Sequence, residues 1–412
     1  MPSVWVWRSA LPTSTPQNMA HCFKNLDEAS QQECNKLTAM RDTLLRALDS
    51  STSFDALTTA ANNYLPWLCA VLRATETMAP ALSAPLNFSW CMPYTVRYAR
   101  TPATATSLRF EHAMVMLSLA FSYRKRASEI LSSNFCSSSS STSSSSTSGV
   151  DGGNEGMMMM TITDGETIKQ SASLLCKAAG VFDWLSSQPL MAWANSLICA
   201  ETNTEFHSAW SSVCLLEAQE LTLRKGLTGG NVVISGGTAA KLMREISRRA
   251  GEAASVFEKL AKAGEGVVSG DEMRLRGVGA YLVGTSAVYR GWMHRVLGVA
   301  AYNEMKKGVA VAHLAEARPT DQESKMLFNK KQLRETVMPE FMKGVTAEVE
   351  ETVKLYNAYS KENSTVYFET VPKPAQLTLP DPAMLAKPSP YIPPEPAPLS
   401  IHFKDSSSCS IQ

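Results

Sequence analysis

The sequence predicts a mainly α-helical chain with a small β element. Apolar residues recur at helical spacing over several long stretches, and the strand-type alternation of apolar and polar residues is rare. The chain has 412 residues, of which 44% are hydrophobic and 19% charged, so it can bury one large core or two ordinary ones. This composition excludes a disordered polypeptide over most of the length.

Helices are expected from the N-terminal third onward. The apolar pattern of Ser30–Leu82 predicts two helices with a break near Ser50–Ser53, and Pro66 marks a candidate kink. The short segment Leu86–Trp90 follows a proline-containing stretch and is expected to be irregular or extended. The segment Ser107–Leu131 carries a wide apolar face and predicts one long helix.

Further helices are expected downstream, separated by glycine-rich or polar segments. Their predicted ranges are Thr167–Leu185, His207–Lys225, Thr238–Ala263, Ser269–Val299 and Gln332–Tyr359. Long helices in such succession are expected to be antiparallel. Pairs of them could stack like a tetratricopeptide array, although no clean repeat at a fixed period is present.

Three segments depart from the helical pattern. Residues 137–153 begin with an unbroken run of Ser and Thr and predict a flexible, disordered insertion. The composition of Val366–Val371 predicts one strand. Residues 372–398 hold 10 prolines, and the apolar residues between them favour an extended belt packed along the helices over a proline-rich ligand for another domain.

We therefore expect a single domain. Residues 1–29 form an N-terminal arm, residues 30–398 the helical domain with its insertion and belt, and residues 399–412 a flexible tail. The first acidic residue is Asp27, which is a faint sign of a transit peptide. Because Arg8 is the one basic residue before Lys24, a short strand or arm packed on the body is the preferred interpretation.

The charge balance and the cysteine usage narrow the classes of function. Thirty-nine Lys and Arg against 38 Asp and Glu give a net charge of +1, so no overall field attracts nucleic acid or an anionic membrane. Nine cysteines, an odd number without a CxxC pair, indicate the reduced thiols of a cytosolic protein. Two long uncharged stretches, Thr77–Val96 and Trp184–Ala200, are broken by prolines and polar residues and predict no membrane span.

The sequence contains no recognisable catalytic or metal-binding constellation. The six histidines include no HxxxH pair, so neither a metal site nor a cofactor is expected. The glycine-rich segment Gly226–Gly237 precedes a helix and could cradle a phosphate, but it lacks the Gly-Lys-Ser/Thr of a P-loop. A flexible interhelical loop is the plainer interpretation, and an enzyme using a phosphate or nucleotide at this loop is the alternative.

The last four residues, Cys-Ser-Ile-Gln, form a candidate prenylation box. Cys409 is fourth from the end, an aliphatic residue stands third in the box, and a terminal Gln favours farnesyl. We expect farnesyltransferase to modify Cys409, with methylation as part of the same processing; a stray terminal cysteine is the alternative. One prenyl chain without a polybasic patch gives weak, reversible membrane binding, so a membrane-bound partner has to supply a second contact.

Seven segments, in order along the chain, carry a resemblance to a known family. They are Asn62–Leu68, Leu86–Trp90, Ser107–Glu111, Lys177–Leu185, Leu215–Glu220, Lys306–Leu314 and Glu362–Pro372. Together these segments resemble the Bro domain family, an Alix-like endosomal-targeting module. Each match is loose alone, but their order and spacing extend over most of the chain. With the terminal box, the chain resembles the prenylated Brox-type members of this family.

The resemblance implies a boomerang-shaped helical domain with a tetratricopeptide-like core, a small sheet and no enzymatic activity. It also implies a groove that receives the amphipathic C-terminal helix of a Snf7-type ESCRT-III subunit. By similarity to the family, the groove positions are Thr222, Leu242, Ile246 and Ala250, with an acidic position at Asp164. The sequence departs from the family pattern at Thr222, where an aromatic residue is expected, and at the glycine insertion 226–237, which shifts the helix register. Core packing is the other interpretation of Leu242 and Ile246.

The expected function is a non-catalytic adaptor that docks on ESCRT-III at the cytosolic face of endosomal or nuclear-envelope membranes. Farnesyl at Cys409 would add avidity, because linking two weak contacts makes the second one intramolecular. The alternatives are the phosphate- or nucleotide-using enzyme and a generic helical scaffold that presents Pro388–Pro398 as a proline-rich ligand.

Overall fold

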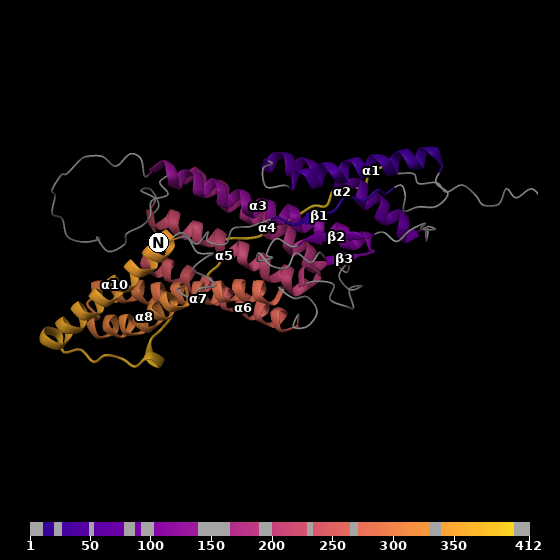
Figure 1. The fold of residues 1–412 in the computed structure, drawn as a ribbon. Helices are drawn as coiled ribbons and strands as arrows, with labels where there is room; N and C mark the ends of the chain where they lie inside the picture. The colour runs from indigo at the N-terminus through magenta and orange to yellow at the C-terminus, as the bar shows by residue number, and fades with distance from the viewer. Residues whose placement is uncertain are drawn as a thin grey trace, which may run out of the picture.

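Long helices dominate the structure, a computed structural model shown in Figure 1. It describes residues 11–19, 27–48, 53–77, 87–91, 103–138, 165–188, 200–228, 234–263, 271–328 and 339–398. The helices are α1 (Glu28–Ala47), α2 (Phe54–Thr77), α3 (Leu108–Ser138), α4 (Gly165–Ser187), α5 (Thr204–Thr228), α6 (Gly236–Ala263), α7 (Asp271–Asn303), α8 (Lys307–Phe328) and α10 (Pro339–Glu362). The predicted mainly α-helical fold class is confirmed.

Consecutive helices pack on one another along an elongated array (Figure 1). Each helix from α1 to α7 contacts the next in the chain, and α8 contacts α10. The end of α10 lies at the opposite end of the array from α1 and α2 (Figure 1). From α10 the chain returns across the array as an extended segment, which passes through two short helical turns, η4 (Asn363–Tyr367) and η5 (Pro374–Gln376).

A small antiparallel sheet lies beside α3. Its strands are β1 (Thr13–Ser14), β2 (Phe88–Cys91) and β3 (Ala103–Ala105), in the order β1-β2-β3. The N-terminal arm thus supplies an edge strand, and the segment expected to be irregular or extended becomes the central strand. Phe88 and Trp90 on alternate positions of β2 are fully buried, as expected for a strand with one face on the core.

Aromatic side chains from four successive helices form the centre of the core. Phe121 of α3 and Trp210 of α5 meet edge to face with ring centroids 5.3 Å apart, and Phe182 of α4 stacks on Trp210. Phe257 of α6 contacts the same indole at 5.6 Å. Because all four rings are fully buried, this cluster fixes the spacing of α3 to α6.

Helix α8 was not predicted as a helix, and its composition explains why. It contains Gly308 near its start and Pro319 inside, which both disfavour a helix. Its buried face also carries polar side chains, including His313, Asp321 and Ser324, so the apolar periodicity is weak. By contrast α2 continues through Pro66 without ending, although the proline was a candidate kink.

The predicted strand at Val366–Val371 is wrong. Asn363–Tyr367 forms the π-helical turn η4, and Phe368 follows with φ of 56°, in the left-handed region. Asn363 causes this turn, because its amide donates to the Glu369 carbonyl at 2.9 Å and its Oδ1 accepts from the Glu369 N–H at 3.1 Å. A chain pinned in this way cannot extend.

Candidate functional site

The predicted groove positions on α6 lie in the core. Leu242, Ile246 and Ala250 are between 0 and 1% exposed, and they form one stripe at spacing i, i+4, i+8. Thr222 on α5 is half-buried, with its hydroxyl donating to the Ala218 carbonyl at 3.0 Å. Asp164, Cys409 and the serine-rich insertion beyond residue 138 lie outside the described residues.

The outward face of α6 is charged rather than apolar. Arg248 donates to Glu245 at 2.7 Å and to Glu252 at 2.5 Å, and Arg249 donates to Glu245 at 2.7 Å. Hydrogen bonding from Arg248, with a further contribution from Arg249, lowers the pKa of the Glu245 carboxyl. These ion pairs between successive turns of α6 stabilise the helix surface, and they offer little apolar area to a partner.

The C-terminal extended segment runs over α6 and α5 (Figure 1). Gln219, fully buried on α5, brackets it: its amide donates to the Ala383 carbonyl and its carbonyl accepts from the Leu385 N–H, each at 2.7 Å. Arg244 of α6 donates to the Pro380 carbonyl at 2.6 Å. The helices therefore recognise the main chain of this segment, which suits a stretch whose prolines lack N–H donors.

The same segment continues over α4 to α2. The Ser389 N–H donates to the Cys176 carbonyl, and the Ala397 N–H donates to the Pro66 carbonyl, both at 2.9 Å. Gly180 has no Cβ where the Ser389 carbonyl oxygen passes, and a side chain there would collide with it. Residues 379–397 thus lie against four helices. This stretch includes most of the segment 388–398 that was the candidate proline-rich ligand, and in this structure it is packed on the protein's own helices.

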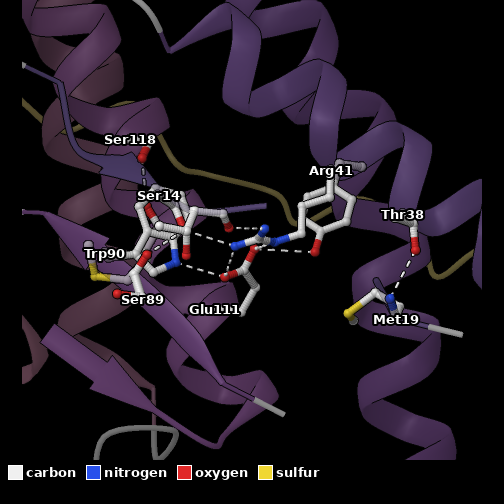
Figure 2. Close-up of polar contacts among 11 residues, drawn as sticks. Ser14, Met19, Thr38, Arg41, Ser89, Trp90, Glu111 and Ser118 are labelled. Atoms are coloured by element: carbon white, nitrogen blue, oxygen red, sulfur yellow. Dashed lines mark hydrogen bonds and ion pairs between the residues drawn. The ribbon is translucent and has the colours of Figure 1, made fainter. Parts of the chain in front are cut away.

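A buried ion pair fastens the sheet to the helices (Figure 2). Arg41 of α1 donates to Glu111 of α3 at 2.7 Å and to the Thr15 carbonyl at 2.7 Å. Trp90 of β2 donates its indole N–H to the other Glu111 oxygen at 2.7 Å. Although burial opposes the charged form, Glu111 raises the pKa of the Arg41 guanidinium. The arrangement is structural, since Arg41 and Glu111 are both fully buried.

Further buried ion pairs join α3 to α5 and lie within α5. Arg124 donates to Glu217 at 2.9 Å, and Arg224 donates to Glu220 at 2.6 Å. Burial raises the pKa of Glu220 to about 7, although Arg224 opposes the shift. None of these four side chains is more than 4% exposed, so a substrate could not reach them.

A cysteine and a histidine lie in contact, but the pair is not activated. The Cys69 thiol is 3.6 Å from His112 Nε2. Burial raises the pKa of the Cys69 thiol and lowers the pKa of His112 to about 4, so both groups are neutral near pH 7. A nucleophilic cysteine requires the thiolate, which this environment disfavours.

The glycine-rich loop offers little to a phosphate. Ser235 stands before α6, and its hydroxyl accepts from the Thr238 N–H at 3.2 Å, which uses an amide that an anion would need. The Gly226 carbonyl accepts from the Ile234 N–H at 3.1 Å, and the Ile234 side chain fills the space beside the glycine. Residues 229–233 of the loop lie outside the described residues.

The described residues provide neither a metal-binding cluster nor a membrane-spanning helix. No group of three or more His, Cys, Asp or Glu side chains in that part of the chain could hold a metal ion. None of the helices described is long and apolar enough to cross a membrane.

Comparison with known proteins gives a family and a fold. A family model described as "BRO1-like domain" matches residues 19–406. The chain is similar to the solved "ALIX BRO1 CHMP4C complex", with a TM-score of 0.65, 15% identity, and coverage of 95% of this chain and 96% of that one. Similarity to ALIX in complex with the SIVmac239 PYKEVTEDL late domain has a TM-score of 0.63 and 14% identity, covering 95% of this chain and 50% of that one.

A third structure, described as the basis for endosomal targeting by the Bro1 domain, matches with a TM-score of 0.60 and 15% identity, over 92% of this chain and 91% of that one. No curated protein sequence matches the chain significantly.

Proposed function

The chain belongs to the BRO1-like domain family, and from this premise we propose that it is a non-catalytic adaptor for ESCRT-III. The observation that carries the proposal is the likeness, over nearly the whole of both chains, to a Bro1 domain solved with CHMP4C, an ESCRT-III subunit. The partner segment is the amphipathic C-terminal helix of a Snf7-type subunit, which docks helix-in-groove. Binding, rather than chemistry, is the activity.

The docking surface lies along α5 and α6. Leu242, Ile246 and Ala250 support it from below, because their side chains are buried in this state. Thr222 is the predicted groove residue that remains partly open, so it is the position at which a partner helix makes direct contact. Thr222 provides less apolar area than the aromatic residue of the family pattern, and the affinity should be correspondingly modest. Asp164 is kept as the acidic position of the groove.

Binding of a labelled peptide from the C-terminal helix of CHMP4C, followed by fluorescence anisotropy, tests this surface. Thr222→Asp places a carboxylate in the contact and should weaken binding about tenfold or more, because the charge loses hydration without gaining a partner. Ser208→Asp is the matched control, since Ser208 is exposed on the same helix. Equal affinities of the Thr222→Asp variant and the unaltered protein would remove the groove assignment.

Membrane attachment is proposed to come from farnesyl at Cys409, added by farnesyltransferase, as in Brox-type proteins. The extended segment is held to α2 by the Ala397 bond to Pro66, so the tail that carries Cys409 starts from the α1–α2 end of the array. The farnesyl group and the ESCRT-III contact together hold the protein on cytosolic faces of endosomal or nuclear-envelope membranes.

Intact mass spectrometry of the protein from its own cell tests the modification. We expect a mass that reports loss of the last three residues, addition of a farnesyl group and methylation. Cys409→Ser should abolish that mass shift and reduce recovery in the membrane fraction. Unchanged recovery of the Cys409→Ser variant would show that the lipid is dispensable.

A further inference from the structure

Exposed apolar side chains gather where the turn between α7 and α8 meets the end of α10. Nine large apolar side chains are exposed among the described residues, and five of them lie in this region. They are Met305, Val366, Tyr367, Phe368 and Val371, with exposed fractions of 59, 61, 36, 74 and 44%. We call these five residues the apolar corner. Lys307 joins its two parts, with its ammonium 3.2 Å from the Tyr302 ring centroid and 4.9 Å from that of Tyr367.

The backbone of the apolar corner is strained. Met305 has φ of 61° and Phe368 has φ of 56°, and these are the non-glycine residues with left-handed backbone in the described part of the chain. Glycine or asparagine ordinarily takes such positions, because a larger side chain costs free energy there. Met305 and Phe368 gain no compensating burial. Strain of this kind at exposed apolar residues indicates a functional surface.

The apolar corner is also held rigidly. Beyond the clamp from Asn363 to the Glu369 backbone, the Glu369 carboxylate accepts from the Gly308 N–H at 2.7 Å. Glycine at position 308 allows this close approach of residues 369–370 to α8, since a Cβ there would collide with the Thr370 carbonyl oxygen. The turn that presents Phe368 is therefore fixed to the first turn of α8. This attachment holds the Phe368 side chain in its exposed position.

Charges around the apolar corner favour an anionic surface. Glu304 pairs with Lys306 at 2.8 Å, whereas Glu362 and Glu369 accept from the neutral Tyr302 hydroxyl and Gly308 N–H and keep their negative charge. Lys361 and Lys373 are exposed and form no ion pair with a described residue. The four lysines at positions 306, 307, 361 and 373 therefore outnumber these three carboxylates by one, and the balance of charge among them is positive.

We infer that the apolar corner is a membrane-contact site that inserts Met305 and Phe368 into the interface of an anionic bilayer. Exposed aliphatic and aromatic side chains flanked by lysines are the composition of interfacial membrane binders. Tyr367, with its half-exposed ring and polar hydroxyl, suits the headgroup level, and Lys361 and Lys373 face the anionic headgroups. This contact is distinct from Cys409 and from the proposed ESCRT-III surface.

Sedimentation with lipid vesicles tests the proposal on the full chain made in bacteria, which carries no farnesyl group. The unaltered protein should bind vesicles that contain phosphatidylserine, bind phosphatidylcholine vesicles less well, and release as salt rises. The double variant Met305→Asn, Phe368→Asn should bind about tenfold more weakly, because two apolar contacts are lost. Its melting temperature should be unchanged or higher, since asparagine tolerates the left-handed backbone.

Ile392→Asn is the matched control, because Ile392 is 83% exposed on the extended segment, away from the apolar corner. It should bind vesicles like the unaltered protein. Binding by the double variant equal to the unaltered protein, or an equal loss in Ile392→Asn, would overturn the proposal. A dimer that the double variant cannot form, with no vesicle binding by the unaltered protein, would assign the surface to a second copy of the chain instead. Neither Cys409 nor an ESCRT-III peptide enters this experiment, so its result is independent of the proposed function.

Discussion

The two ends of the helical array bury charge in different ways. At the α1–α3 end, Glu111 accepts from Arg41, from Trp90 and, at 3.3 Å, from the Tyr64 hydroxyl. Arg41 also donates to the Ser14 hydroxyl at 2.9 Å and to the Thr15 carbonyl. Both members of the ion pair are therefore surrounded by partners, which is the condition for a buried pair to stabilise a fold.

At the α7–α10 end, the buried charges are less completely matched. Arg295 of α7 pairs with Glu348 of α10, but Asp321 of α8, only 2% exposed, has one carboxylate oxygen without a hydrogen-bond partner among the described residues. Its other oxygen lies so close to Gly291 that a Cβ there would overlap it. Burial raises the pKa of Asp321 to about 7, although Thr352 and Arg295 oppose the shift.

The difference shows that burial alone does not decide what a charged group does. A carboxylate that accepts hydrogen bonds on both oxygens joins the helices and strands that supply the donors. A carboxylate given too few donors becomes neutral near physiological pH and makes stability depend on pH. The sheet end of the protein should therefore be held by charge, and the α10 end should respond to pH.

Glu111→Gln should have the largest effect on stability. It keeps the side-chain shape but leaves the Arg41 guanidinium buried without its counter-charge. We expect the free energy of unfolding to fall by about 3–5 kcal/mol, measured by urea denaturation.

Glu129→Gln on the same helix is the control for Glu111→Gln. Glu129 pairs with Lys125 at 3.8 Å, and its side chain is 45% exposed. The change should be within about 0.5 kcal/mol. If the Glu111→Gln loss is as small as that of the control, the hydrogen bonds of an uncharged side chain at position 111 hold the sheet as well as the ion pair does.

Asp321→Asn should remove a pH dependence. The folded-state pKa is about 7 and the ordinary value is 3.8, so the folded state keeps a proton that the unfolded state has released. The contribution of Asp321 to the free energy of unfolding should therefore fall as pH rises from about 4 to about 7, and level off above that. The amide has no such slope, and the variant should be about 1–3 kcal/mol more stable at pH 8 than the unaltered protein.

Urea denaturation at pH 5 and at pH 8 measures this effect. The gain of the Asp321→Asn variant should be clearly smaller at pH 5 than at pH 8, because at pH 5 only part of the interval between the ordinary pKa of 3.8 and the folded-state pKa of about 7 has been crossed. A gain of the same size at both pH values would show that Asp321 does not titrate over this range.

Tyr64→Phe should weaken the sheet end by a smaller amount. It removes one hydroxyl donor to Glu111 while Arg41 and Trp90 remain, so we expect a loss of about 1 kcal/mol in urea denaturation. In the double variant with Glu111→Gln, the loss should be less than the sum of the two single losses, because the partners share one network. Strict additivity would contradict a shared network.

The sequence predicted the helices with continuous apolar stripes far better than the others. The helix expected at Thr238–Ala263 is α6, whose buried stripe is plain in the sequence. Helix α8 was missed because His313 and Asp321 are polar and yet buried, and a pattern of apolar residues cannot report burial that depends on partners in other helices. The strand expected at Val366–Val371 failed for a similar reason, since the Asn363 clamp is a side-chain contact that periodicity does not contain.

The candidate sites show the same limit. Cys409 rests on a local motif and needs no fold to be recognised, whereas Thr222 and Leu242 depended on similarity to a family. Neither route could find the apolar corner. Met305 and Phe368 carry no local signal of left-handed backbone, which glycine or asparagine would have provided, and their exposure follows from contacts between η4 and α8.

Arg290→Gln should have the smallest effect and gives the sharpest comparison within one helix. Arg290 of α7 pairs with Glu323 of α8 at 3.0 Å, with side chains 49% and 47% exposed, whereas the Arg295–Glu348 pair of the same helix is 6% and 7% exposed. Water already screens the exposed pair, so we expect a loss of about 0.5 kcal/mol or less in urea denaturation, shrinking further in high salt. Both pairs join α7 to a neighbouring helix through an arginine and a glutamate. A similar loss for Arg290→Gln and Arg295→Gln would therefore mean that burial of the ion pair does not determine its contribution to the free energy of unfolding. A much larger loss for Arg295→Gln, insensitive to salt, is what burial of the pair requires.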